Sequence, residues 1–104
     1  MRRDRRLLVD RPIIVTDVSF TASSADEQLS GLRGWIAATL NGKIRIDGLT
    51  LRVTLDGRVV ISWPARRGAS GHHHHYIRPL SREAQAEVER QIFAALRRQG
   101  ILPR

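Results

Sequence analysis

Cysteine is absent from the 104 residues, which excludes disulfides, thiol nucleophiles and zinc sites built on cysteine. The longest apolar runs are only a few residues, whereas a membrane-spanning helix needs about 20. The arginine-rich start also lacks the apolar stretch of a signal peptide, so we expect a cytoplasmic protein. The length fits one domain, which we predict over residues 13–104, after a basic and mobile arm over residues 1–12.

Lysine is almost absent, because Lys43 stands alone beside 17 arginines. The formal net charge is +8, and residues 33–78 carry +6 of it while residues 13–32 carry −3. The planar fork of arginine suits phosphates and base edges better than an ammonium group does. The charge therefore indicates a polyanionic partner, although charge also keeps a small basic protein soluble.

Catalytic motifs are missing too. The chain has no Gly-x-Ser-x-Gly elbow, no phosphate-binding loop and no His-Glu-x-x-His pair. Glu83, Glu87 and Glu89 have the spacing of a helix surface, where Arg90 can pair with them. We therefore expect neither enzymatic activity nor a cofactor.

One five-residue phrase occurs twice, fifteen positions apart, as Thr39–Lys43 and Thr54–Arg58. Asn-Gly or Asp-Gly between alternating apolar runs is the strongest short-range signal for a β-hairpin. The sequence thus predicts a meander with strands at about residues 31–39, 43–54 and 58–63, preceded by a first strand over residues 13–20. By composition, we expect loops at residues 21–28 and 65–71.

The register of each hairpin follows from which side chains share a face. A three-residue loop with Gly57 in the left-handed region pairs Val53 with Val59, Leu51 with Ile61 and Leu49 with Trp63. The same loop in the first hairpin pairs Ala38 with Ile44 and Ile36 with Ile46. The apolar phase changes at Asp47-Gly48, where we predict a bulge. This register places six apolar residues on the face of the sheet that we expect to be buried: Ile36, Ile44, Leu51, Val53, Ile61 and Trp63.

After Pro79 the apolar period changes from 2 to 3.6. The pattern predicts an amphipathic helix of about 18 residues, with Ser81 as N-cap, Glu83 in the first turn and Gly100 as the stop. Its buried stripe is Ala84, Val88, Ile92, Ala95 and Leu96. The predicted fold class is therefore α+β, an antiparallel meander sheet of four to five strands with a C-terminal amphipathic helix.

Several segments resemble, in matching order over about residues 13–98, the stage V sporulation protein G family (SpoVG, septation protein). The segments are Val15-Thr16-Asp17-Val18, Thr39-Leu40, Ile44–Val53, and Gly57–Pro64 followed by Arg66-Arg67. Trp63, Ala65 and Arg78 depart from the residues usual in the family, which are Met, Ser and His. The resemblance implies a small cytoplasmic homodimer linked to septation, cell division and sporulation, and a regulator that binds DNA or RNA.

The candidate nucleic-acid-binding residues lie mostly around the exit of the last strand. Arg66, Arg67 and Arg78 have the composition of a phosphate-contact site, and Tyr76 can stack on a base or pack as a strand residue. On the other face of the meander, Arg45 and Arg52 project with Trp35. That face is a nucleic-acid surface, a dimer face or solvent-exposed sheet. A protein-interaction module of the division or envelope machinery is the alternative function.

Two further features carry open alternatives. The run His72–His75 offers at most two metal ligands on one face of a strand, so we predict no metal site there. The run is instead interpreted as an exposed strand edge or as a pH-dependent part of the basic patch. Trp63 is expected in the core beneath the helix. Trp35 falls among polar residues, which indicates an interface or simple partial burial.

Overall fold

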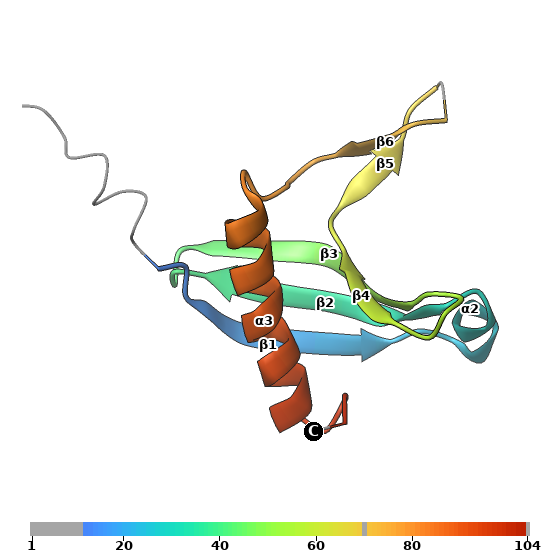
Figure 1. Cartoon of the computed structure of the whole chain (residues 1–104), viewed down its shortest axis with the longest axis horizontal. Helices are drawn as coiled ribbons and strands as arrows, with labels where there is room; N and C mark the ends of the chain where they lie inside the picture. Colours follow the sequence, from blue (N-terminus) through green and yellow to red (C-terminus); the bar gives the residue numbers. More distant parts are fainter. Residues whose placement is uncertain (1–11, 70, 104) are drawn as a thin grey trace, which may run out of the picture.

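The computed structural model describes residues 12–69 and 71–103, apart from the side chains of Arg67 and His73. Four strands form an antiparallel meander in the order β1-β2-β3-β4, and one long helix lies across one face of it (Figure 1). This arrangement confirms the predicted α+β class. The elements are β1 (Val15–Ala22), α2 (Ala25–Leu29), β2 (Leu32–Leu40), β3 (Ile44–Val53), β4 (Val59–Ser62), β5 (Ala65–Arg67), β6 (His73–His75) and α3 (Arg82–Arg98). Most of the predicted arm lies outside the described residues.

The β3–β4 hairpin has the predicted register. Val53 pairs with Val59 and Leu51 pairs with Ile61, although the regular pairing ends at Ser62 and does not reach Trp63. Gly57 has a φ of 86° and donates its N–H to the Thr54 carbonyl at 2.9 Å, which makes a type I turn followed by a left-handed residue. The bulged three-residue loop is confirmed.

The register predicted for the β2–β3 hairpin is wrong. Ala38 pairs with Ile46, and Leu40 pairs with Ile44. Asn41 and Gly42 both have positive φ, 53° and 65°, and the Lys43 N–H donates to the Leu40 carbonyl at 3.0 Å, so the three-residue loop spans residues 41–43, one position later than predicted. Ile44 consequently lies on the last rung before the turn and is 59% exposed, not in the core.

The predicted bulge at Asp47-Gly48 is confirmed. Ala38 pairs with Ile46 but Ile36 pairs with Leu49, so β3 contains one extra residue between these two rungs. Gly48 takes a φ of +83° there. Ile46 and Leu49 are both buried as a result, which restores a single core face on both sides of the bend.

Replacing Gly48 by alanine is expected to lower the free energy of unfolding by about 1 kcal/mol, because a Cβ disfavours left-handed backbone. Space is not the obstacle, since a Cβ would meet only Pro64 side-chain carbons at 3.8 Å. Gly48→Asn is the matched control and should cost less, because asparagine tolerates this conformation. Urea denaturation measures both. Equal losses for alanine and asparagine would contradict the backbone explanation.

Helix α3 agrees with the prediction at both ends. The Ser81 hydroxyl accepts from the Ala84 N–H at 3.0 Å, and Gly100 follows the last turn with a φ of 76°. The buried stripe is Val88, Ile92, Ala95 and Leu96, while Ala84 is only half-buried. Val88, Ile92 and Leu96 of this stripe form one hydrophobic core with residues of the sheet, namely Ile36, Ile46, Leu49, Leu51, Ile61 and Trp63.

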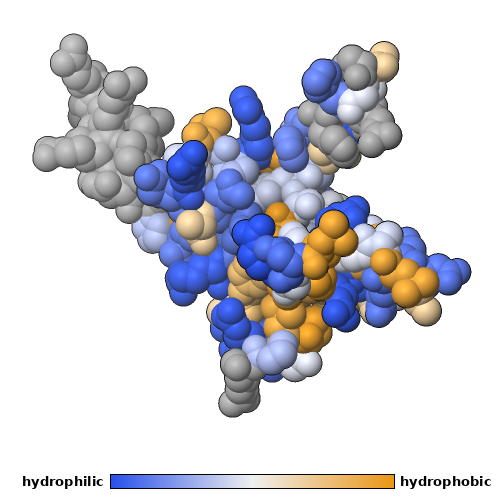
Figure 2. All heavy atoms as spheres, turned by 45° about the vertical axis from the view of Figure 1, so that its right-hand side comes forward, coloured by the Kyte–Doolittle hydropathy of each residue, from blue (hydrophilic) through white to orange (hydrophobic). Residues whose placement is uncertain are grey.

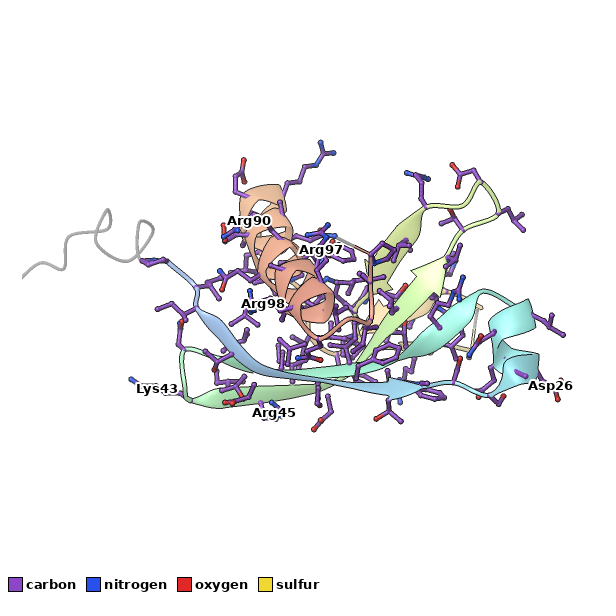
Figure 3. All side chains as sticks on the ribbon, turned by 90° about the horizontal axis from the view of Figure 1, so that it is seen from below. Asp26, Lys43, Arg45, Arg90, Arg97 and Arg98 are labelled. Carbon is purple, nitrogen blue, oxygen red and sulfur yellow. The ribbon has the colours of Figure 1, made fainter. Side chains whose placement is uncertain are left out.

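Side-chain amides of α3 also fix the helix to β1. The Gln91 amide donates to the Ile13 carbonyl at 2.7 Å and accepts from the Val15 N–H at 2.8 Å. The Gln99 amide donates to the Val18 carbonyl at 2.8 Å. The helix therefore covers one face of the meander, and the opposite face, which we call the open face, carries no helix (Figure 3).

The loop predicted at residues 21–28 is partly wrong, because it holds the end of β1 and the start of α2. Ser24 and Glu27 form a reciprocal capping box, in which each side chain accepts from the backbone N–H of the other. The pKa of Glu27 is lowered, mainly by the hydrogen bond from the Ser24 backbone N–H and to a smaller extent by the hydrogen bond with the Ser24 hydroxyl. The Ser-x-x-Glu signature was present in the sequence and was missed.

Candidate nucleic-acid interface

The segment after β4 is a second, two-stranded sheet, which we call the ribbon (β5 and β6). Arg66 pairs with His74, and the neighbouring rungs are Ala65 with His75 and Arg67 with His73. The ribbon projects away from the meander and the helix (Figure 1). The flexible loop predicted at residues 65–71 is therefore wrong for residues 65–67. The last three residues of the histidine run, His73–His75, form β6, where His74 and His75 are exposed.

One face of the ribbon carries two of the predicted site residues, Arg66 and Tyr76, together with His74. Arg66 is directly opposite His74, and the Tyr76 N–H extends the pairing by donating to the Pro64 carbonyl at 3.0 Å. Because strand side chains alternate, Arg66, His74 and Tyr76 share one face. Tyr76 is 66% exposed, so the alternative that it packs as a strand residue is wrong.

Arg78 lies in the segment that joins the ribbon to α3, and its side chain is exposed. This segment belongs to a long stretch without acidic residues, since no Asp or Glu occurs between Asp56 and Glu83. The same stretch contains five arginines and all four histidines. The ribbon and its two connections thus form a cationic region that contains no carboxylate side chain of its own.

Arg45 lies on the open face, on the side of the sheet away from the helix (Figure 3). One terminal nitrogen donates to the Asp17 carbonyl at 2.6 Å and to the Thr39 hydroxyl at 3.0 Å, and the other donates to Ser19 at 3.2 Å. Asp17 has a φ of 50° and sits in a register shift of β1, which turns its carbonyl toward the guanidinium. Arg45 is thereby fixed across three strands, and its two other N–H groups have no acceptor among the described residues.

Arg52 connects the open face to the ribbon. It lines a hollow of about 560 Å³, which we call the ribbon hollow and which also contains His75 of β6. The remaining lining residues are Gly48, Thr50, Ser62, Trp63 and Ala65. The sequence did not indicate His75 as a neighbour of Arg52, because their proximity depends on how the ribbon leaves β4.

The ion pairs in the described part of the chain lie elsewhere. Arg58 binds Asp56 at 3.0 Å on the β3–β4 loop, and Arg90 binds Glu87 at 2.7 Å on α3. The pKa of Asp56 is lowered chiefly by the Thr54 hydroxyl, and the pKa of Glu87 chiefly by Arg90. Both carboxylates are therefore ionised at neutral pH, and they hold arginines outside the ribbon.

Over residues 12–69 and 71–103, histidines and carboxylates form no group of three or more that could hold a metal ion. No helix within these ranges is long and apolar enough to cross a membrane. A comparison with protein-family models and with curated proteins found no match to this chain.

Proposed function

We propose that this protein is a nucleic-acid-binding regulator of the SpoVG type, which contacts DNA or RNA through the ribbon and the open face. The observation that carries the proposal is the ribbon hollow, where Arg52 of the sheet and His75 of the ribbon line one surface. A polyanion lying there would reach the meander and the acid-free stretch together. The role in septation or sporulation rests on the resemblance of the sequence alone.

The test is binding of labelled DNA and RNA oligonucleotides at 50 and 200 mM salt. Three phosphate contacts, one each from Arg52, Arg66 and Arg78, predict a loss of affinity of about 40-fold for duplex DNA over this range, and about 20-fold for a single strand. Absence of binding at 50 mM salt, or binding that does not respond to salt, would refute the proposal.

We also propose that the protein is a homodimer. Among the described strands of the meander, β1 and β4 lie at the edges, and β1 already uses its Val15 N–H and Val18 carbonyl to bond side-chain amides of Gln91 and Gln99, so β4 offers the freer edge for pairing with another chain. Light scattering on a sizing column at micromolar concentration should give twice the mass of one chain. A monomer mass over that concentration range would remove the dimer without affecting the nucleic-acid proposal.

A second candidate function, a protein-interaction module, is favoured by an apolar hollow of about 460 Å³ beside the C-terminal end. Figure 2 shows apolar side chains gathered on this side of the molecule. The apolar residues that line it are Phe20, Ala22, Leu51, Val53, Val59, Ile101, Leu102 and Pro103. Affinity capture that retrieves a defined protein and no nucleic acid would support this function over the first.

A further inference from the structure

Trp35 occupies an unusual place for a large aromatic residue. It lies on the open face with 38% of its surface exposed, whereas Trp63, the other tryptophan, is 9% exposed in the core. Its neighbours across the sheet are hydroxyl residues, because Thr21 and Thr50 pair with it on either side. The indole is therefore a single large apolar surface among short polar side chains, which is a suitable platform for a flat ligand.

A hollow of about 390 Å³, which we call the tryptophan hollow, lies beside Trp35. Its polar groups are the Arg45 guanidinium, the Asp47 carboxylate and the hydroxyls of Ser19 and Thr21. The carboxylate repels a phosphate but accepts hydrogen bonds from the amino and imino groups of bases. The chemistry next to the indole thus suits a base better than it suits the backbone.

The tryptophan hollow and the ribbon hollow share one lining residue, Gly48 at the bulge of β3. The two hollows are therefore adjacent, one on each side of Gly48, and the surface that contains them runs from Arg45 and Trp35 at one end to Arg52 and His75 at the other. A chain of nucleotides following this surface would place a base on the indole and phosphates near the ribbon.

We infer that the open face binds single-stranded nucleic acid, with Trp35 stacking on an unpaired base. This inference rests on the proposed function and narrows its ligand. A base in a duplex is stacked on both sides and offers no free face, whereas every unpaired base offers a π-face to an aromatic platform. Trp35 therefore distinguishes single strands from duplexes, while the arginines bind the phosphates of either.

The experiment compares three ligands: a labelled single strand, the duplex of the same sequence, and an abasic strand with the same number of phosphates. The intact protein should bind the single strand most tightly, with a change in Trp35 emission that is lost in Trp35→Phe. Trp35→Ala should weaken binding of the single strand by about 5- to 150-fold and leave abasic binding and the salt slope unchanged. Trp35→Phe should keep most of the affinity because it keeps an aromatic face.

Each other outcome has a distinct meaning. Equal, salt-dependent binding of all three ligands, unaltered in Trp35→Ala, overturns the stacking inference and leaves the proposed function intact. Loss of abasic and single-strand binding by the same factor in Trp35→Ala overturns it as well, because Trp35 would then only support the fold. A monomer in Trp35→Ala where the intact protein is a dimer would make the residue a subunit contact. Absence of binding to any ligand overturns both proposals.

Discussion

Replacing Arg52, Arg66 and Arg78 together by alanine is expected to weaken nucleic-acid binding at 50 mM salt by about 500-fold for a single strand and about 3,000-fold for duplex DNA. Each arginine that contacts a phosphate releases condensed counterions, and the loss of three contacts removes that contribution. The slope of log affinity against log salt should become shallower by about 2.7 for duplex DNA or about 2 for a single strand. Fluorescence anisotropy over a series of salt concentrations measures both quantities.

The matched control removes the same amount of charge from the other side of the molecule. Arg90, Arg97 and Arg98 lie on α3, across the sheet from Arg45 (Figure 3). If affinity depends on the ribbon and the open face, alanine at these three positions should change the salt slope little. Equal effects of the two triple variants would mean that net charge, and not this surface, determines binding.

The elements that the sequence predicted correctly are those fixed by neighbours in the chain. The Leu55-Asp56-Gly57 loop closes between Thr54 and Arg58, whose backbone groups bond at 2.8 Å, and its turn chemistry is local. The α3 cap, stripe and stop are also contained within one segment. These turns and caps depend on the conformational preferences of a few neighbouring residues, so the sequence predicts them without knowledge of the rest of the fold.

Strand β5 and its pairing with β6 could not be predicted in the same way. Ala65, Arg66 and Arg67 have little preference for strands, and they form β5 because the backbone of residues 73–75 lies beside them. Arg45 illustrates the same limit at the level of a side chain. Its orientation depends on the carbonyl of Asp17, 28 positions earlier, which a register shift of β1 turns toward it. Non-local pairing thus decides most of the candidate site.

Under the proposed function, one face of the meander serves stability and the other serves binding. The face that carries α3 holds the buried aliphatic residues, and Trp63 stands at its end, immediately before the turn into the ribbon. The Trp63 indole N–H donates to the Glu89 carboxylate at 2.8 Å, which ties this end of the sheet to the helix. Trp63 therefore connects the packing of the helix with the end of the sheet from which the ribbon leaves.

Replacing Trp63 by alanine is expected to lower the free energy of unfolding by about 3–5 kcal/mol, because it leaves a large cavity in the core. Trp63→Phe should cost about 1–3 kcal/mol, since it keeps an aromatic ring but loses the hydrogen bond to a charged group. Urea denaturation followed by far-ultraviolet circular dichroism measures both losses without depending on tryptophan emission.

Trp35→Ala is the control, because it removes the same side chain from the open face. Its cost in stability should be smaller, about 1–2 kcal/mol, because 38% of this residue is already exposed to water. The comparison assigns the two tryptophans to different roles: Trp63 should change unfolding, and Trp35 should change binding. Similar losses of stability at both positions would show that the open face is packed against something in solution, and the surface proposed for nucleic acid would then be an interface between protein chains.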